Sequence, residues 1–534
     1  MGLIGFLWHT SRWMALAAIV LGIVSGAASA GLVACLNTLL ASGADSNWLV
    51  PAFVGLVVVA FATTTASQLL FLHLAQSGAY ALRVELSLRM VSARYHDLER
   101  AGAARLLSTL TEDVQSIATA LPGIPVTCTS AAAIIACLAY LGTLSFRGLA
   151  CILAFLLIGV GTYRIPAAIG VRALTRARGV QDRLFSHFRA LTEGAKELKM
   201  NAGRRARFVA ELEATAARYR RQARFGLSVY AAAASWGHFL FFAAAGGIAI
   251  LGQRAGLGAS EVTGFGLVIL YMMSPIGSIM EWQPLFARAS VALRHIKGLG
   301  LPADPADPPA ASSAPFEALE LVDVMYRYCG EEVDELFTLG PLRLSLRPGE
   351  LVFVIGGNGS GKSTMAKLLT GLYLPDQGEI RLNGARVTER DVDQYRQHFS
   401  VVFSDYFLFD DLHGLGAHDA ASASGHLAAL RLDRKVRMLD GRFSTTALSQ
   451  GQRKRLALVA AYLEDRPIYV FDEWASDQDP IFRRVFYEQL LPELKRRGKA
   501  IVVISHDEQY YESADRLVRL EHGRLVDGAG PLRA

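Results

Sequence analysis

A glycine-rich loop between an apolar run and a helical pattern is the first feature of this sequence that predicts chemistry. The apolar run Leu351–Ile355 leads directly into GGNGSGKST, residues 356–364, which fits the pattern G-x-x-x-x-G-K-[ST]. Glycine lets backbone N–H groups close around phosphate oxygens, and the helix that begins near Lys362 directs its positive end toward them. We expect Lys362 to reach the β- and γ-phosphates and the Ser363 hydroxyl to bind Mg²⁺. The loop therefore predicts a nucleotide site.

Two further apolar runs end in side chains that suit phosphate chemistry. Ile468–Phe471 precedes Asp472 and Glu473, and residues 501–504 lie just before His506. In a parallel sheet the carboxyl ends of neighbouring strands meet at one edge, so these groups should lie beside the phosphate loop. We expect Asp472 to bind Mg²⁺, Glu473 to polarise the attacking water and His506 to contact the γ-phosphate. The alternatives are a solvated acid pair and a structural histidine, and the order of the motifs favours the catalytic interpretation.

The stretch LSQGQ, residues 448–452, opens another helical pattern with hydroxyl and amide groups. Helix starts of this kind attract anions, because their first N–H groups have no partner within the helix. This helix start has no phosphate loop of its own. The pattern therefore indicates that it meets the phosphate of a partner chain.

The composition indicates a membrane part joined to a soluble part. A chain of 534 residues is too long for one compact core, and its 52% hydrophobic content is concentrated in the first 290 residues. The net charge is +6, and the arginines are concentrated between the apolar runs, where the cytoplasmic loops of membrane proteins carry them. We therefore expect no nucleic-acid partner. The five cysteines show no CxxC spacing, which favours small buried hydrophobes over a disulfide framework or a zinc site.

Six apolar stretches are long enough to cross a bilayer, which takes roughly 20 helical residues. They lie near Trp13–Leu40, Trp48–Leu74, Leu121–Leu144, Gly148–Val171, Leu227–Leu251 and Val262–Phe286. The N-terminus also fits a secretory signal, since Arg12 and a short apolar region precede the small residues at 28–30. Against the signal, the apolar run continues to Leu40, and cleavage would leave five spans.

The loops between these stretches predict the orientation. The long loops after spans two and four are rich in arginine, whereas the opposite loops are short and nearly neutral. The positive-inside rule puts both long loops and both termini in the cytoplasm. The spacing of Leu82, Leu86 and Met90 predicts that the long loops are helices that continue out of the membrane.

A Pro- and Ala-rich stretch, PADPADPPAASSAP at residues 302–315, is predicted to be a linker because it cannot form a packed core. We therefore expect a transmembrane domain at 1–300, a linker at 301–316 and a nucleotide-binding domain at 317–534. The last domain should begin with strands at 318–324 and 342–346 and then alternate strand and helix to about residue 520. That alternation is typical of a largely parallel α/β sheet.

Taken in order, the phosphate loop, LSQGQ, FDE, Asp479 and ISHD resemble the nucleotide-binding domain of an ABC transporter. Six spans ahead of this domain resemble an ABC exporter half-transporter, and the resemblance covers nearly the whole chain. More narrowly, LSQGQRKRLALVAAYLEDRPIYVFDEWASDQDP and VVFSDYFLFD resemble the exporter branch for cyclic peptides and peptide siderophores of the pyoverdine and syringomycin type. The implied fold is an all-α six-helix membrane domain of the type IV ABC exporter kind, fused to an α/β P-loop ATPase domain.

The resemblance also implies partners and site residues. Two copies would pair head to tail as a homodimer, with ATP and Mg²⁺ between one copy's phosphate loop and the other's LSQGQ helix. Tyr328 would stack on adenine, and Asp479 would lie in the loop that links the two ATP sites. Residues 106–114 and 193–208 match cytoplasmic loops that dock on nucleotide-binding domains. The residues expected to bind the nucleotide are Tyr328, Gly356, Gly357, Asn358, Gly359, Ser360, Gly361, Lys362, Ser363, Thr364, Ser449, Gln450, Gly451, Gln452 and Asp479. The expected catalytic residues are Lys362, Glu473 and His506. The expected metal ligands are Ser363, Asp472 and Ser404.

Two positions depart from the general family pattern. Gln450 stands where the family has Gly, although Gly451 and Gln452 remain. Ser404, followed by Asp405, stands where a Gln normally meets Mg²⁺ and water. A serine hydroxyl is shorter than a glutamine side chain, so a water or Asp405 would have to bridge to the metal.

Charged residues inside the apolar stretches usually face protein or water, because a charge at mid-bilayer costs on the order of 2.5–3.5 kcal/mol on insertion scales. Arg164 and Glu281 are the candidates, with His238, Trp236 and Trp282 nearby. Each either lines a substrate cavity or sits at the inner membrane interface.

The expected function is therefore ATP-driven export of a cyclic or nonribosomal-type peptide, for example a siderophore or its precursor, by a homodimer embedded in membrane lipid. One alternative is an ABC exporter of the same kind that transports a lipid or a drug-like molecule. Another is an ATP-gated membrane sensor without transport, which should carry degenerate catalytic residues. Glu473, His506 and Lys362 are all present, and this disfavours the sensor.

Overall fold

The computed structural model describes residues 3–42, 48–252, 254, 256–302, 315–329, 336–412 and 420–526. The chain divides into two compact units, of which the first takes in residues 1–88 and 103–301 and the second residues 89–102 and 302–534. Residues 303–314, which form most of the predicted linker, lie outside the described residues. The second unit thus contains a short segment, residues 89–102, from the loop after the second apolar helix.

The first unit is entirely helical in its described part. Its long helices are α1 (Leu3–Ser42), α2 (Leu49–Ser92), α6 (Gly123–Leu144), α7 (Phe146–Glu193), α9 (Ala202–Leu251) and α10 (Ala259–Lys297). Its short helices are α4 (Ala103–Ser108), η2 (Thr109–Asp113), α5 (Val114–Ala120) and α8 (Ala195–Met200). Six of the described helical segments are long and apolar enough to cross a membrane, as the sequence predicted.

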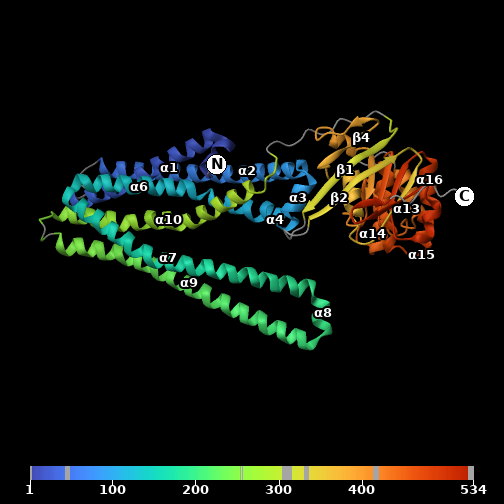
Figure 1. Cartoon of the computed structure of the whole chain (residues 1–534). Helices are drawn as coiled ribbons and strands as arrows, with labels where there is room; N and C mark the ends of the chain where they lie inside the picture. The colour runs from blue at the N-terminus through green and yellow to red at the C-terminus, as the bar shows by residue number, and fades with distance from the viewer. Residues whose placement is uncertain are drawn as a thin grey trace. The chain divides into compact units, whose positions relative to one another are not determined.

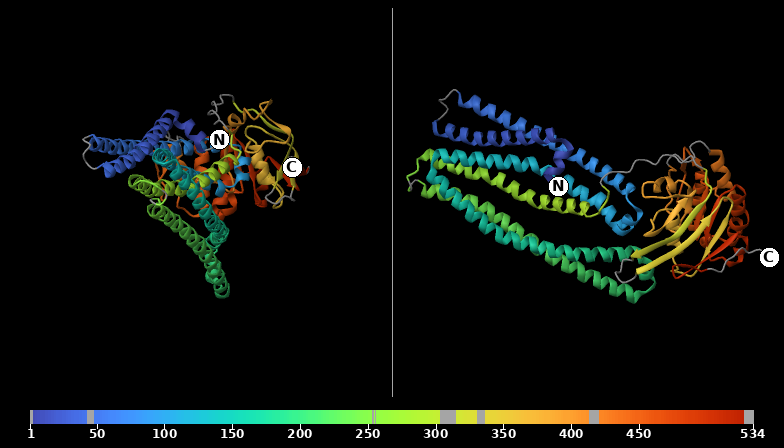
Figure 2. Two further views of the ribbon diagram at one scale, coloured as in Figure 1. Left: turned by 90° about the vertical axis from the view of Figure 1, so that its left-hand side faces the viewer. Right: turned by 45° about the horizontal axis from the view of Figure 1, so that its top comes forward.

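The membrane helices continue well beyond a bilayer. Helices α7 and α9 contain 48 and 50 residues, which corresponds to about 72 and 75 Å, whereas the hydrocarbon core is about 30 Å thick. They run side by side and are joined by α8 (Figures 1 and 2). The continuation of α2 packs Leu82 and Leu86 against Val114 and Ile117, with all four side chains buried. The prediction that the long loops are helical continuations of the membrane helices is confirmed.

The second unit contains two main sheets. An antiparallel sheet of order β2-β1-β4-β5 is formed by β1 (Leu319–Cys329), β2 (Leu336–Leu346), β4 (Gln377–Leu382) and β5 (Ala385–Arg386). A second sheet of order β12-β11-β3-β10-β9-β6 is formed by β3 (Leu351–Ile355), β6 (Phe399–Val402), β9 (Ile468–Asp472), β10 (Ala500–Ile504), β11 (Arg516–Glu521) and β12 (Arg524–Val526). All its pairs are parallel except β11 with β12. The predicted parallel sheet is therefore present, but the first two predicted strands belong to the antiparallel sheet.

Shorter elements complete the second unit. The helices are α3 (Tyr95–Ala101), α11 (Lys362–Leu369), α12 (Val392–Arg396), α13 (Ala420–Ala429), α14 (Gln450–Glu464), η3 (Trp474–Asp477), α15 (Pro480–Val485), η4 (Phe486–Leu490), α16 (Leu491–Arg496) and η5 (Glu508–Ser513). Strands β7 (Met438–Leu439) and β8 (Arg442–Phe443) form a small hairpin.

The parallel sheet is apolar on both faces, which explains the continuous apolar runs in the sequence. Along β9, Ile468 and Val470 belong to the core on one face, and Tyr469 and Phe471 to the core on the other. Strand β10 aligns Ile504 with Asp472 of β9. The carboxyl ends of β3, β9 and β10 therefore meet at one edge, where the candidate site lies.

Candidate active site

The phosphate loop adopts a conformation that requires glycine at two positions. Gly356 has φ 153°, and an added Cβ would lie 2.2 Å from the Leu520 carbonyl oxygen. Gly361, which precedes α11, has φ 101°, and its Cβ would meet the Phe337 ring at 2.9 Å. At either position, any other residue would have a strained backbone and would displace the neighbouring Leu520 or Phe337. The loop between them exposes Gly357, Asn358 and Gly359, and Ser363 and Thr364 follow in the first turn of α11.

Lys362 lies inside this loop. Its Nζ donates to the carbonyl oxygens of Gly356 at 2.8 Å and Gly357 at 2.9 Å, and the residue is buried. Burial lowers the pKa of the Lys362 ammonium, although the charges of Glu473 and Asp472 oppose that effect. The Ser360 hydroxyl is buried and has no hydrogen-bond partner in the structure. The loop thus holds one ammonium and one unused hydroxyl where phosphate oxygens would enter.

Asp472 lies at the end of β9 and is buried, with 1% of its surface exposed. The Ser404 hydroxyl donates to Asp472 Oδ2 at 3.1 Å, and the Ser363 side chain also hydrogen-bonds this carboxylate. Burial raises the pKa of Asp472, while the bonds from both serines oppose the rise. The other oxygen, Oδ1, has no partner. An orphaned buried carboxylate oxygen flanked by two hydroxyls fits Mg²⁺, a cation that prefers oxygen ligands.

Glu473 follows β9 in the left-handed region, with φ 50° and ψ 37°. Its backbone N–H donates to the Ile504 carbonyl at 3.0 Å. Its carboxylate Oε1 lies 3.4 Å from Nε2 of His506, which comes just after β10. The structure therefore brings together Lys362, Asp472, Glu473 and His506, which are far apart in the sequence.

The LSQGQ segment forms the start of α14. Ser449 is the N-cap residue, its side chain makes no capping bond, and the first turn contains no acidic residue. Gly451 packs so closely that an added Cβ would lie 2.8 Å from the Asp477 carbonyl oxygen. Among the described residues, no hydrogen bond or ion pair joins 449–452 to the phosphate loop at 356–364. This exposed helix start thus keeps its anion-binding groups free of the chain's own loop.

The remaining candidates are placed as follows. Gln450 donates to Asp477, and Gln452 accepts a hydrogen bond from Lys435. Tyr328 lies on β1 opposite Phe337 and is half-buried. The Asp479 carboxylate caps α15 by accepting from two backbone N–H groups, at 3.1 and 3.0 Å.

Residues 89–102 contribute a contact that the sequence analysis did not identify. In this α3 docking contact, Glu99 accepts a hydrogen bond from Tyr373 and forms an ion pair with Lys367 at 2.9 Å. His96 Nδ1 lies 3.1 Å from the Tyr326 hydroxyl, and the Tyr326 and Tyr373 rings stack at 4.7 Å. Residues 106–114, which the resemblance suggested for docking, belong to the first unit, and their docking stays a prediction. Lys367 lies on α11, the helix that begins at the phosphate loop.

We predict that Glu99→Gln loosens α3. Burial opposes ionisation of Glu99, but the hydrogen bonds from Tyr373 and Lys367 prevail and lower its pKa. A lowered carboxylate pKa stabilises the docked state above the ordinary glutamate pKa, and this stabilisation is lost as the pH falls through the lowered value. Amide exchange in residues 95–101 should become about fivefold faster, which corresponds to about 1 kcal/mol.

Arg94→Gln is the matched control for this experiment. It removes a pair with Glu389 in which both side chains are about two-thirds exposed, so exchange should change little. Equal exchange rates in wild type and Glu99→Gln would show that the pair does not hold the helix.

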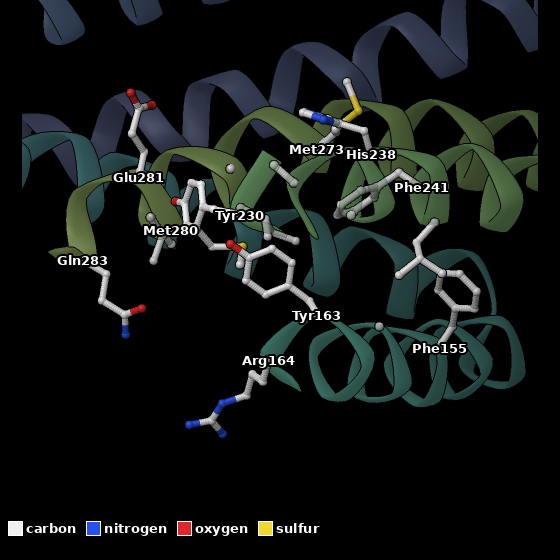
Figure 3. A pocket seen from close by; sticks show the side chains of 17 residues that line it. Phe155, Tyr163, Arg164, Tyr230, His238, Phe241, Met273, Met280, Glu281 and Gln283 are labelled. Atoms are coloured by element: carbon white, nitrogen blue, oxygen red, sulfur yellow. The ribbon is translucent and has the colours of Figure 1, made fainter. Parts of the chain in front are cut away.

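A cavity of about 610 Å³ lies between α7, α9 and α10 of the first unit. Its lining is mainly aromatic and aliphatic, and includes Phe155, Tyr163, Tyr230, Phe241, Met273 and Met280. Figure 3 shows the two tyrosine rings at its centre, and their side chains hydrogen-bond each other. Arg164, His238 and Glu281 also line it, whereas Trp236 and Trp282 do not. Trp236 instead donates to Thr162, and Trp282 packs against Gly123.

The comparisons with known proteins agree with this geometry. Residues 339–476 match the family model described as ABC transporter. The chain is similar to the ATP-binding protein SyrD of Pseudomonas syringae pv. syringae, with 34% identity over 97% of this chain and 95% of that protein. It is also similar to the ATP-dependent lipid A-core flippase of Paraburkholderia xenovorans, with 28% identity over 91% and 84% of the two chains. The solved structure of a bacterial Atm1-family ABC exporter with ATP bound has a TM-score of 0.74 at 17% identity, over 97% and 94% of the chains.

Proposed function

The chain belongs to the ABC transporter family as an exporter half-transporter that couples ATP hydrolysis to transport, and on that premise we propose its assembly and cargo. Two copies form a homodimeric pump in a bacterial inner membrane, with the nucleotide-binding domains in the cytoplasm. The pump exports a cyclic or nonribosomal-type peptide, such as a siderophore or its precursor. The observation that carries the peptide assignment is a largely apolar cavity whose lining includes charges of both signs.

The free helix start of α14 supports the dimer. One chain supplies a phosphate loop with Lys362 and, at a different place, an uncapped helix start at Ser449. Pairing two copies head to tail would place each helix start on the γ-phosphate held by the other copy. Each ATP site would then be complete only in the dimer, and an isologous pair satisfies both helix starts at once.

The chain's own residues divide the chemistry among them. Lys362 binds the β- and γ-phosphates, and Ser363, Asp472 and Ser404 would hold Mg²⁺, which neutralises developing phosphate charge when bound. Glu473 orients the attacking water and accepts its proton. His506 lies next to that carboxylate and would contact the γ-phosphate from β10. The Ser404 hydroxyl donates directly to Asp472, and a water or Asp405 would bridge Ser404 to the metal.

The cavity supports an amphipathic cargo. Phe155 and Phe241 lie about 14–15 Å along α7 and α9 from their outer ends, which is near mid-membrane. Arg164 and Glu281 lie about 27 and 33 Å from the outer ends of α7 and α10, which is near the cytoplasmic interface. An apolar chain or aromatic side chain would occupy the inner part, while a carboxylate and an ammonium would meet Arg164 and Glu281. Zwitterionic peptides combine these groups.

A lipid cargo is the second candidate, because relatives named as lipid A-core flippases cover most of the chain. The apolar lining of the cavity is compatible with acyl chains. Glu281 disfavours a polyanionic headgroup, since like charges repel. The cavity therefore favours a peptide.

We predict that the two charges set the affinity for cargo. In purified dimer reconstituted in nanodiscs, Arg164→Gln or Glu281→Gln should raise the peptide concentration for half-maximal ATPase stimulation about tenfold, equivalent to about 1.4 kcal/mol. Basal hydrolysis should stay within about twofold, because neither residue touches the nucleotide.

Arg172→Gln is the matched control, since Arg172 is an exposed arginine on the same helix α7 and does not line the cavity. A panel of cyclic and acylated peptides is compared with a lipid of the lipid A-core type. Stimulation by the lipid alone, or peptide affinities that neither substitution changes, would contradict the peptide assignment.

A further inference from the structure

Lys454 is a buried cation next to the catalytic strand. It lies in the second turn of α14, and only 3% of its side chain is exposed. Its ammonium lies 2.6 Å from Asp477 Oδ2, and it donates to the Glu473 carbonyl oxygen at 2.9 Å and to the Ser476 hydroxyl at 3.1 Å. A buried ammonium is stable only when its donors are paired. All three partners lie in residues 473–477, the turn that follows β9.

A second bond ties the same residue to the same turn. The Trp474 indole N–H donates to the backbone carbonyl of Lys454 at 2.9 Å, and Trp474 is buried. The side chain and the main chain of Lys454 are therefore both bonded to the turn that carries Glu473. This arrangement restrains the turn in position and in orientation.

Glu473 needs such a restraint. Its backbone is in the left-handed region, at φ 50°, which residues other than glycine adopt only where the surroundings hold them. The Glu473 N–H is bonded to Ile504, and its carbonyl oxygen is bonded to Lys454. The two peptide groups that flank the catalytic side chain are thus fixed by β10 on one side and by α14 on the other.

The same turn is also bonded to the start of α14. Asp477 Oδ2 accepts from Gln450 Nε2 at 3.2 Å as well as from Lys454. Gln478 Nε2 donates to the Gly451 carbonyl at 3.0 Å. Any shift of the helix start at 449–452 must therefore change the bonds of the turn at 473–477.

We propose that Lys454 is a positioning residue that makes the orientation of Glu473 depend on the helix start of its own chain. This inference rests on the proposed dimer, in which that helix start touches the ATP held by the partner copy. Binding of ATP at one site would then fix Glu473 at the other site. The ion pair between Lys454 and Asp477 is the physical link, and it makes hydrolysis at the two sites cooperative.

The test is the ATP dependence of hydrolysis by full-length protein in nanodiscs. For Lys454→Gln and for Asp477→Asn, we expect kcat to fall about tenfold, with ATP binding within about twofold of wild type. The Hill coefficient should fall from above 1 to 1. The double variant should be no worse than Lys454→Gln alone, because that substitution already removes the ion pair with Asp477. Lys454→Arg should restore part of the cooperativity, and exposed Arg434→Gln should change nothing.

Thermal unfolding and binding of a fluorescent ATP analogue identify any variant that has merely misfolded, in which case Lys454→Arg and Asp477→Asn carry the test. Cooperativity that persists in folded variants would overturn the inference. A wild-type Hill coefficient of 1 would overturn it as well. The mass of the wild-type protein in the nanodisc tests the proposed homodimer separately, since a monomer would contradict the dimer itself.

Discussion

Replacing Glu473 with Gln is expected to lower kcat for ATP hydrolysis about 100- to 10,000-fold, the usual contribution of a general base. The amide keeps the shape and the contact with His506 but cannot accept a proton from water. Binding of ATP should stay within about threefold, because Lys362 and the glycine loop hold the phosphates. In the proposed homodimer, the two copies should therefore remain closed around uncleaved ATP.

The measurement is single-turnover hydrolysis beside equilibrium binding of ATP, in purified full-length protein. Glu512→Gln, an exposed carboxylate in η5, is the matched control and should behave like wild type. If Glu473→Gln retained more than about a tenth of the wild-type kcat, another group would have to activate the water.

Asp472→Asn is expected to separate stability from activity. Burial raises the pKa of Asp472, although the hydrogen bonds from Ser363 and Ser404 oppose the rise. An ionised Asp472 therefore destabilises the folded, nucleotide-free protein. A raised carboxyl pKa means that the folded state binds the proton more tightly than the unfolded state, so stability falls as the pH rises through the raised pKa. At neutral pH the neutral amide should therefore raise Tm, by about 2–4 °C for about 1 kcal/mol in a domain of this size.

The same substitution should lower hydrolysis by about 100-fold or more, because it removes the buried carboxylate that fits Mg²⁺. Adding ATP with Mg²⁺ should raise the Tm of wild type more than that of Asp472→Asn. Thermal scans between pH 5 and 8, with and without Mg²⁺ and ATP, measure the two effects on Tm, and an ATPase assay measures the loss of hydrolysis. A variant that is less stable than wild type without nucleotide at every pH would contradict the assigned cost of burial.

Much of the site could be predicted from the sequence because its parts are local. The residues from Gly356 to Thr364 are contiguous, and the loop conformation follows from its glycines. Asp472, Glu473 and His506 could be placed together because each follows an apolar strand, and parallel strands end at one edge. The six membrane helices follow from the length of their apolar runs.

Other features depend on contacts between distant residues. Glu99 meets Lys367 and Tyr373 across more than 260 positions, and neither periodicity nor a motif indicates such a contact. Lys454 resembles any solvated lysine on a helix, and only its partners in the irregular turn at 473–477 show that it is buried. Membrane helices are apolar all round, so the inward direction of Tyr163 and Tyr230 has no clear signal in sequence.

ATP-dependent accumulation of cargo in inverted membrane vesicles tests the central claim most directly. Labelled cyclic and acylated peptides are compared with a labelled lipid, and vesicles that carry Glu473→Gln serve as the blank. The proposed function predicts that at least one peptide accumulates with ATP and that the substitution abolishes this accumulation. Movement of the lipid without the peptides would contradict the cargo, and ATP binding without turnover or accumulation would contradict the pump.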